Sequence, residues 1–191
     1  MEPMIPAFND ACNYIASRVF PLGFDICRGA PNTMMELGVS LNIHQRMAIW
    51  DGDHEETCFA NTETWRQFRA WHDWVHYRFD CAFTLEGEHK ALHIQAGQLM
   101  RLYGRGPDVV DMIALMFCNI IGPLENKLVP GYQAVTGREY CEANMKHWLA
   151  YAQNIVDTQG ITDVDAIQCA ESAYDFRSRF GPEVPREALP H

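Results

Sequence analysis

With 191 residues, of which 48% are hydrophobic and 12% aromatic, the chain has the composition of a folded globular protein and not of a disordered one. Acidic residues outnumber basic residues 25 to 15, and the formal net charge of −10 disfavours binding to a nucleic-acid backbone. The longest apolar run, VVDMIALMFCNII, is too short to span a bilayer and contains an aspartate, so we expect no membrane segment.

The first predicted elements are a short helix and a small β-hairpin. Residues 8–19 have helical periodicity, and Asn9 and Asp10 are candidate N-caps for them. Within residues 37–50, the segments VSLNI and MAIW alternate between apolar and polar positions. We therefore expect a hairpin of two short strands near residues 38–50, with a helix as the alternative.

The clearest pattern predicts a helix over residues 62–79, which Asn61 and Thr62 can cap. Its inward residues recur at intervals of three and four, as on one face of a helix: Trp65, Phe68, His72, Val75, His76 and Phe79. Both histidines of this helix are therefore expected inside the fold.

Two more helices follow in close succession. Thr84 can cap a helix over residues 84–103, whose first turn carries acidic side chains. A helix over residues 107–121 comes next, and Gly122 and Pro123 are expected to end it. Because this helix is apolar nearly all round, we expect it at the centre of a bundle.

The C-terminal part continues the helical pattern. A loop over residues 123–137 precedes two helices, over residues 138–157 and 163–179. Residues 181–191 have no apolar period and are expected to be a mobile tail. The sequence thus predicts a mainly α, single-domain helical bundle over residues 1–180.

The cysteines and the first residues indicate where the protein works. No pair has the Cys-x-x-Cys spacing of a zinc ribbon, and the number is odd: Cys12, Cys27, Cys58, Cys81, Cys118, Cys141 and Cys169. Such usage is typical of a reducing compartment. Because MEPMIPAFND lacks the features of a signal peptide, we expect a soluble, cytoplasmic protein.

Two histidines and an aspartate lie within little more than one turn of the helix over residues 62–79. His72 and His76 are neighbours on one face, and Asp73 meets His76 one turn on. Imidazole nitrogens and carboxylate oxygens are donors that transition metals prefer. This spacing favours a metal site.

The following helices carry further candidate groups. Glu88, His89 and His93 come at the start of the next helix, and helices joined by a short link pack side by side. Asp111 lies in an otherwise apolar helix, where a carboxylate is costly to bury unless it is paired or bound to metal. These groups could therefore face the first histidine pair.

The segment WHDWVH, with His72, Asp73 and His76, resembles the His-Asp-x-x-His core of the HD superfamily. Members of that family are helical, metal-dependent phosphohydrolases that act on nucleotides and related phosphate esters. The resemblance covers residues 44–111 and implies a divalent metal ion (Mn, Mg or Zn) and a small phosphate ester as substrate. The wider R-x-W-H-D-x-x-H segment is also similar to segments of small uncharacterised phage proteins.

In the HD family the adjacent His-Asp pair binds metal, and an upstream histidine and a downstream aspartate complete the site. The resemblance implies that His72 and Asp73 are this pair and that Asp111 is the downstream ligand. The upstream ligand would be His44, with His54 as the alternative.

The implied reaction is metal-assisted hydrolysis, in which the ion activates a water and neutralises charge on the phosphoryl group. Either Glu88 or His76 would act as general base. Arginines near the motif or on the next helix are candidate phosphate-binding groups: Arg69, Arg78, Arg101 and Arg105.

A non-haem di-iron site is the rival interpretation. Helical bundles of that kind place acid-x-x-His pairs on facing helices. Asp73 and His76 match one such pair, with Glu88 as a bridging carboxylate, but Glu142 and His147 are five residues apart and do not form a clean second pair. This interpretation predicts bound iron.

A non-enzymatic helical binding module is the third interpretation. In it, Trp65, Trp71 and Trp74 would form the interface of a homodimer. It predicts an exposed aromatic patch and no bound metal.

Overall fold

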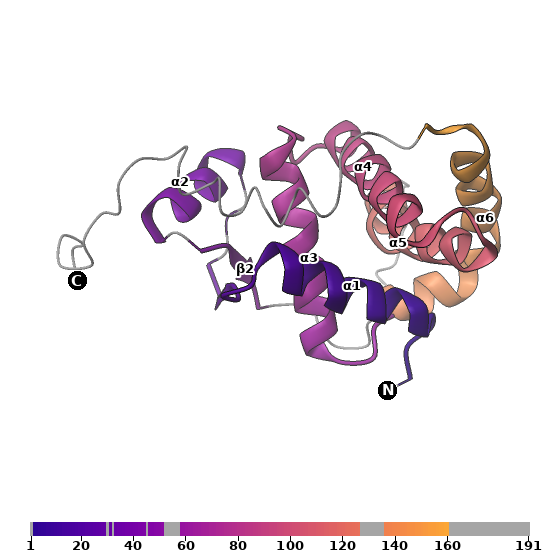
Figure 1. The fold of residues 1–191 in the computed structure, drawn as a ribbon, viewed down its shortest axis with the longest axis horizontal. Helices are drawn as coiled ribbons and strands as arrows, with labels where there is room; N and C mark the ends of the chain where they lie inside the picture. Colours follow the sequence, from indigo (N-terminus) through magenta and orange to yellow (C-terminus); the bar gives the residue numbers. More distant parts are fainter. Residues whose placement is uncertain are drawn as a thin grey trace.

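The computed structural model describes residues 2–29, 31, 33–44, 46–51, 58–126 and 136–160. Within these residues the chain forms six helices and two short strands (Figure 1), in the order α1 (Pro6–Val19), β1 (Asp25–Cys27), α2 (Met34–His44), β2 (Ala48–Trp50), α3 (Thr62–Arg78), α4 (Leu85–Tyr103), α5 (Pro107–Asn126) and α6 (Gly137–Thr158). The prediction of a mainly α fold with a small β element is confirmed for this part of the chain. The predicted helix 163–179 and tail 181–191 lie outside the described residues, and the domain extent of 1–180 stays a prediction.

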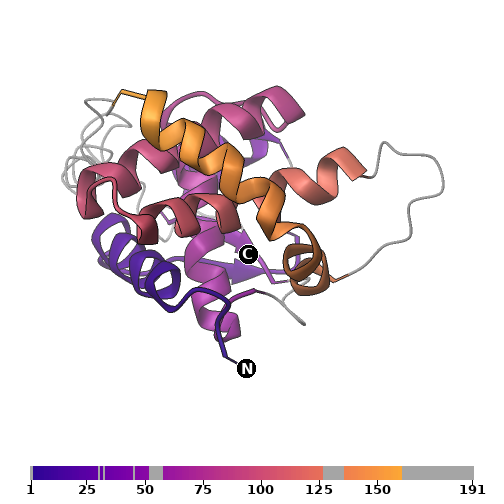
Figure 2. The same ribbon diagram turned by 90° about the vertical axis from the view of Figure 1, so that its right-hand side faces the viewer.

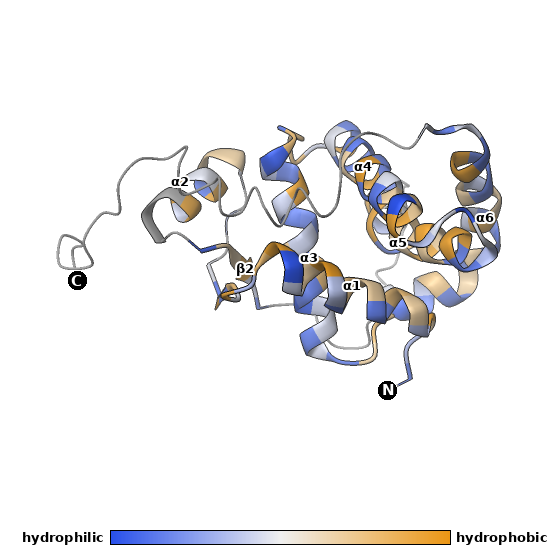
Figure 3. Cartoon of the chain, viewed as in Figure 1, coloured by the Kyte–Doolittle hydropathy of each residue, from blue (hydrophilic) through white to orange (hydrophobic). Residues whose placement is uncertain are grey.

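Helix α3 occupies the middle of the fold. It packs against α1, α2, β2 and α4, and Figure 1 shows it between the α2 end of the molecule and the α4–α6 end. Its buried residues include five of the six predicted to face inward: Trp65, Phe68, His72, Val75 and His76. The sixth, Phe79, is the C-cap and is partly buried. Along α3 and α4, hydrophobic and hydrophilic residues alternate, as in amphipathic helices (Figure 3).

The predicted ranges of α3, α4 and α6 agree with the observed ones to within one residue at each end. The Asn61 side chain accepts a hydrogen bond from Thr64 N at 2.8 Å, which confirms it as the N-cap of α3. The Thr84 hydroxyl likewise accepts from Gly87 N at 3.2 Å at the start of α4. Both caps satisfy backbone N–H groups that a helix leaves without a partner in its first turn.

Replacing Asn61 by alanine is expected to lower the free energy of unfolding by about 1 kcal/mol, because Thr64 N loses its acceptor. Denaturant unfolding followed by circular dichroism measures the change. Asn61→Ser keeps an oxygen acceptor at the same position and should leave stability nearly unchanged. Equal losses in the two variants would contradict a capping role.

The predicted N-caps of the first helix, Asn9 and Asp10, are wrong. The helix α1 begins at Pro6, with Ile5 as the capping residue. Proline suits the first helical turn because its missing N–H would have no partner there. Asn9 instead donates from Nδ2 to Ile5 O at 3.2 Å and accepts from Ala60 N at 2.9 Å, so it joins α1 to the segment that precedes α3.

The small β element is a parallel pair and not the predicted hairpin. Strand β1 pairs with β2 in the register Ile26 to Ile49, and α2 lies between the two strands in the sequence. Parallel strands require such a crossover, because a tight turn cannot join them. Residues 34–44 are helical because Leu37 and Leu41, four positions apart, are both buried on one face.

Helix α5 does not end at residue 121, as predicted, but continues through Gly122 and Pro123 to Asn126. Packing against α6 accounts for this continuation, because a Cβ on Gly122 would lie 2.1 Å from the Tyr140 ring. Helices α5 and α6 pack together most extensively, and Figure 2 shows α6 lying across this end of the fold. Although α5 is long and apolar enough to span a membrane, most of it is buried within the fold, as in a core helix of a globular protein.

Candidate metal centre

The candidate centre lies where the C-terminal half of α3 meets the first turn of α4. His72 and His76 are one turn apart on α3, and Glu88 follows the Thr84 cap of α4. The link between the two helices is short and closely packed, since a Cβ on Gly87 would lie 1.8 Å from the carbonyl oxygen of Ala82. This packing holds the first turn of α4 against the end of α3.

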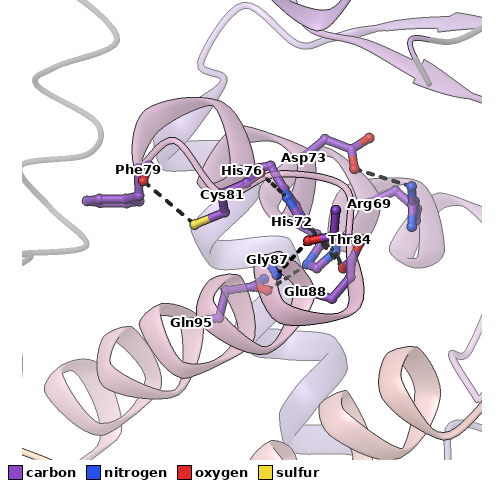
Figure 4. A network of polar contacts seen from close by, with 10 residues as sticks. All are labelled: Arg69, His72, Asp73, His76, Phe79, Cys81, Thr84, Gly87, Glu88 and Gln95. Atoms are coloured by element: carbon purple, nitrogen blue, oxygen red, sulfur yellow. Dashed lines mark hydrogen bonds and ion pairs between the residues drawn. The ribbon is translucent and has the colours of Figure 1, made fainter. Parts of the chain in front are cut away.

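The side chains of His72, His76 and Glu88 converge on one point (Figure 4). Glu88 Oε2 lies 2.9 Å from His72 Nε2 and 3.1 Å from His76 Nε2. The two Nε2 atoms are 3.1 Å apart. His72 and His76 are 1% and 0% exposed. Among the described residues, this is the one group of three histidine, cysteine or carboxylate side chains close enough together to hold a metal ion.

Each histidine uses its other ring nitrogen to contact an oxygen acceptor. His72 Nδ1 donates to Gln95 Oε1 at 2.8 Å, and His76 Nδ1 donates to the backbone carbonyl of Cys81 at 2.7 Å. An amide or carbonyl oxygen can only accept, so the proton of a neutral imidazole lies on Nδ1 in both rings. Both Nε2 lone pairs then point toward each other and toward Glu88.

The carboxyl group of Glu88 is ionised in this setting. Burial acts to raise its pKa, but the hydrogen bonds with His72 and His76, together with their charges, outweigh burial and hold the pKa of Glu88 well below its usual range. Those hydrogen bonds require a proton on each Nε2 atom. When both rings are neutral and carry the proton on Nδ1, the two imidazole lone pairs and the carboxylate repel one another unless a cation lies among them.

This donor set fits a transition-metal ion. Two imidazole nitrogens and one carboxylate oxygen occur in catalytic zinc sites and in mononuclear non-haem iron sites, where three protein ligands leave coordination positions open. Metal-binding histidines also commonly donate their second ring N–H to a carbonyl or carboxylate oxygen, as both histidines do here. The cluster of His72, His76 and Glu88 could therefore hold a metal ion.

Asp73, the second residue of the His-Asp pair, does not join this group. Its Oδ1 lies 3.2 Å from Arg69 Nη2, and Figure 4 shows this ion pair beside the centre. Adjacent residues on a helix point about 100° apart, so His72 faces Glu88 while Asp73 faces another direction. Asp73 therefore lies near the centre, but its carboxylate faces Arg69 and not the two histidines.

Three other predicted site residues have different surroundings. Asp111 is partly buried on α5, where burial and the nearby Asp108 raise its pKa, and it lies outside the group of three ligands. Arg78 lies over the Phe79 ring at 5.7 Å, and Arg101 is exposed in the last turn of α4.

The two candidate upstream ligands have no described side chain. His44 is the last residue of α2, and only its backbone is described. His54 lies outside the described residues. Both assignments stay predictions.

The remaining histidines of α4 contact the neighbouring helices. His89 Nε2 lies 3.8 Å from Glu125 Oε1. His93 contacts Gln159 Oε1 at 2.7 Å and the Tyr151 hydroxyl at 3.2 Å. These contacts connect α4 to α5 and α6, and neither histidine belongs to the candidate centre.

The predictions from sequence missed the residues that orient the two histidines. Gln95 comes seven positions after Glu88, two turns along α4 on the same face. This spacing could have indicated that Gln95 faces the same neighbour as Glu88. No sequence pattern could have indicated the backbone carbonyl of Cys81, because every residue has a backbone carbonyl. Aromatic rings complete the surroundings: Phe68 stacks on His72 at 5.8 Å, and Phe83 lies 4.6 Å from the His76 ring.

Replacing Gln95 by leucine is expected to weaken metal binding by about 10–100-fold, because His72 loses the acceptor that fixes its tautomer. Competition with a chromogenic chelator measures the affinity. Gln98→Leu is the matched control, since it removes the buried acceptor of the Trp71 indole N–H without touching the centre. If both variants weakened binding equally, Gln95 would have no specific role.

No protein-family model, curated protein or solved structure matches the chain. The fold and the site together define a mainly α protein with a candidate centre of two histidines and one glutamate. The resemblance to the HD superfamily stays a prediction based on its short motif.

Proposed function

We propose that the protein binds one divalent transition-metal ion through His72, His76 and Glu88, and uses it to hydrolyse a small phosphate ester. The observation that carries the metal assignment is the convergence of three donor atoms at 2.9–3.1 Å, with both Nδ1 protons directed away from it. In such a centre the ion supplies a Lewis acid and an activated water.

The proposed roles differ from those expected from the sequence. Glu88 and His76, predicted as general bases, are better suited to bind the ion, because their donor atoms face the convergence point. Arg69 lies one turn before His72, and its Nε is buried without a hydrogen-bond partner among the described residues. A guanidinium beside a metal centre can bind a phosphate oxygen, and the position of Arg69 next to His72 and Asp73 is what supports a phosphate ester as substrate.

A mononuclear iron enzyme is the second candidate. Ligands about 2.1 Å from an ion in octahedral geometry lie roughly 3.0 Å apart along one face. The three donor separations here, 2.9, 3.1 and 3.1 Å, are close to that spacing. Asp73 pairs with Arg69, so the described residues bring no second carboxylate to the centre. The geometry therefore supports a mononuclear iron site and not the di-iron site considered from the sequence.

The binding-module interpretation receives little support. Trp65, Trp71 and Trp74 are all buried, at 6%, 0% and 5% exposure, so they do not form the exposed aromatic patch on which that interpretation depends.

Metal analysis of protein purified without a histidine tag tests the proposal. We expect one ion per chain in the parent and in His147→Ala, a matched control because His147 is exposed on α6. His72→Ala and the milder Glu88→Gln should lose the ion while keeping the helical circular dichroism spectrum. The proposal would be overturned if the parent protein bound no metal after incubation with zinc, manganese or ferrous iron.

The reaction is tested on the metal-loaded protein with p-nitrophenyl phosphate and its diester. Release of p-nitrophenol that Glu88→Gln abolishes would support hydrolysis. Bound ferrous iron with oxygen consumption and no hydrolysis would instead favour the second candidate.

A further inference from the structure

Three cysteine side chains from separate parts of the chain meet in the core, away from the candidate metal centre. Cys58 precedes α3, Cys118 lies in the middle of α5, and Cys141 lies in the first turns of α6. All three are fully buried, at 0% exposure. The sequence gives no hint of this cluster, because the three positions are far apart and isolated.

The three thiols lie in a row, with Cys141 in the middle. The Cys141 side chain interacts with that of Cys118 on one side and with that of Cys58 on the other. The Cys58 thiol also contacts Asn119 Oδ1, at 3.5 Å. Because this second contact engages the Cys58 thiol elsewhere, Cys118 and Cys141 are the pair considered for a covalent link.

The backbones that carry Cys118 and Cys141 are held close together. Gly122 lies one turn after Cys118, and Tyr140 precedes Cys141; a Cβ on Gly122 would lie only 2.1 Å from the Tyr140 ring. Helix α6 also begins close to α5, since a Cβ on Gly137 would lie 3.4 Å from Asn119 Oδ1. A disulfide between α5 and α6 requires the two helices to pack closely at this point, because its two Cα atoms are usually less than 7 Å apart.

We propose that Cys118 and Cys141 form a reversible disulfide that links α5 to α6, with Cys58 remaining a thiol. In the reaction two S–H bonds break and one S–S bond forms. Two electrons and two protons pass to a low-molecular-weight disulfide such as oxidised glutathione, which is cleaved to two thiols. Exchange proceeds through a mixed disulfide at one of the two cysteines.

A disulfide fits this arrangement better than a bound soft metal ion, because among the described residues the three sulfurs do not form a group compact enough to share an ion. The hydrogen bond with Cys141 and burial raise the pKa of the Cys118 thiol well above its usual range. A free thiolate would place charge where the surroundings disfavour it, whereas a disulfide carries none. The same burial makes exchange slow, so the pair has to be examined at equilibrium.

Redox titration of the full chain in glutathione buffers containing a chelator tests the proposal independently of the metal centre. Samples are quenched with acid, alkylated and mapped by mass spectrometry. We expect Cys118 and Cys141 to be joined, with the loss of two hydrogens, in the parent and in Cys58→Ser. Cys118→Ser should lose this species completely while keeping its helical spectrum.

The disulfide map of the parent protein is sufficient to identify the pairing, so the proposal remains testable even if a variant fails to fold. The proposal would be overturned if Cys118 and Cys141 remained thiols under conditions that already oxidise the more accessible Cys27. A predominant link between Cys58 and Cys141 would also overturn it. A cadmium-thiolate absorption band that needs these cysteines, without any disulfide, would assign a soft-metal site instead.

Discussion

Zinc at a thousandfold excess over its dissociation constant is expected to raise the free energy of unfolding by about 4 kcal/mol. The three donor atoms come together only in the folded state, because α3 and α4 have to pack before Glu88 reaches His72 and His76. Binding free energy therefore adds to folding free energy. For a chain of this length, the melting temperature should rise by roughly 8–16 °C.

Thermal unfolding followed by circular dichroism, with zinc titrated against a chelator blank, measures this shift. Glu88→Gln and His76→Ala should abolish it, and His147→Ala should keep it, since His147 is exposed and distant in sequence from the three ligands. An equal shift in Glu88→Gln would mean that zinc binds elsewhere. The absence of any shift in the parent would contradict the metal centre itself.

Replacing Gly87 by alanine is expected to lower the free energy of unfolding by about 3 kcal/mol. The added Cβ would lie 1.8, 2.7 and 2.9 Å from the O, C and N atoms of Ala82. These are backbone atoms, so no side-chain rotation can relieve the overlap. The first turn of α4 has to move away from the link, and Glu88 moves with it.

The variant should therefore lose metal affinity as well as stability, and both are measured on the same protein by chemical unfolding and chelator competition. Gly106→Ala is the matched control, because a Cβ there meets nothing within 4 Å, and its effect should stay within about 0.5 kcal/mol. A Gly87→Ala protein as stable as this control would show that the link accommodates a side chain.

The successful predictions were those that depend on local chemistry. The caps at Asn61 and Thr84 were identifiable because a short polar side chain before an amphipathic run can satisfy free N–H groups in the first turn. The inward stripe of α3 was identifiable because helical periodicity is a property of sequence spacing alone.

The predictions that failed depend on contacts between distant segments. VSLNI alternates like a strand, but burial of Leu37 and Leu41 on one side makes it part of α2. Gly122 and Pro123 would end an isolated helix, yet α5 continues where it packs against Tyr140 of α6. In both cases tertiary packing outweighs local preference.

The sequence by itself determined that His72 and His76 share the inner face of a helix and that Glu88 lies in the first turn of the next one, because both are consequences of helical spacing and capping. Only the tertiary structure decided which carboxylate meets the two histidines. The close contact of Gly87 with Ala82 sets α4 against α3 so that Glu88, and not Asp73, reaches both Nε2 atoms. The acceptors that orient the rings, and the meeting of three separate cysteines, likewise depend on how the helices pack.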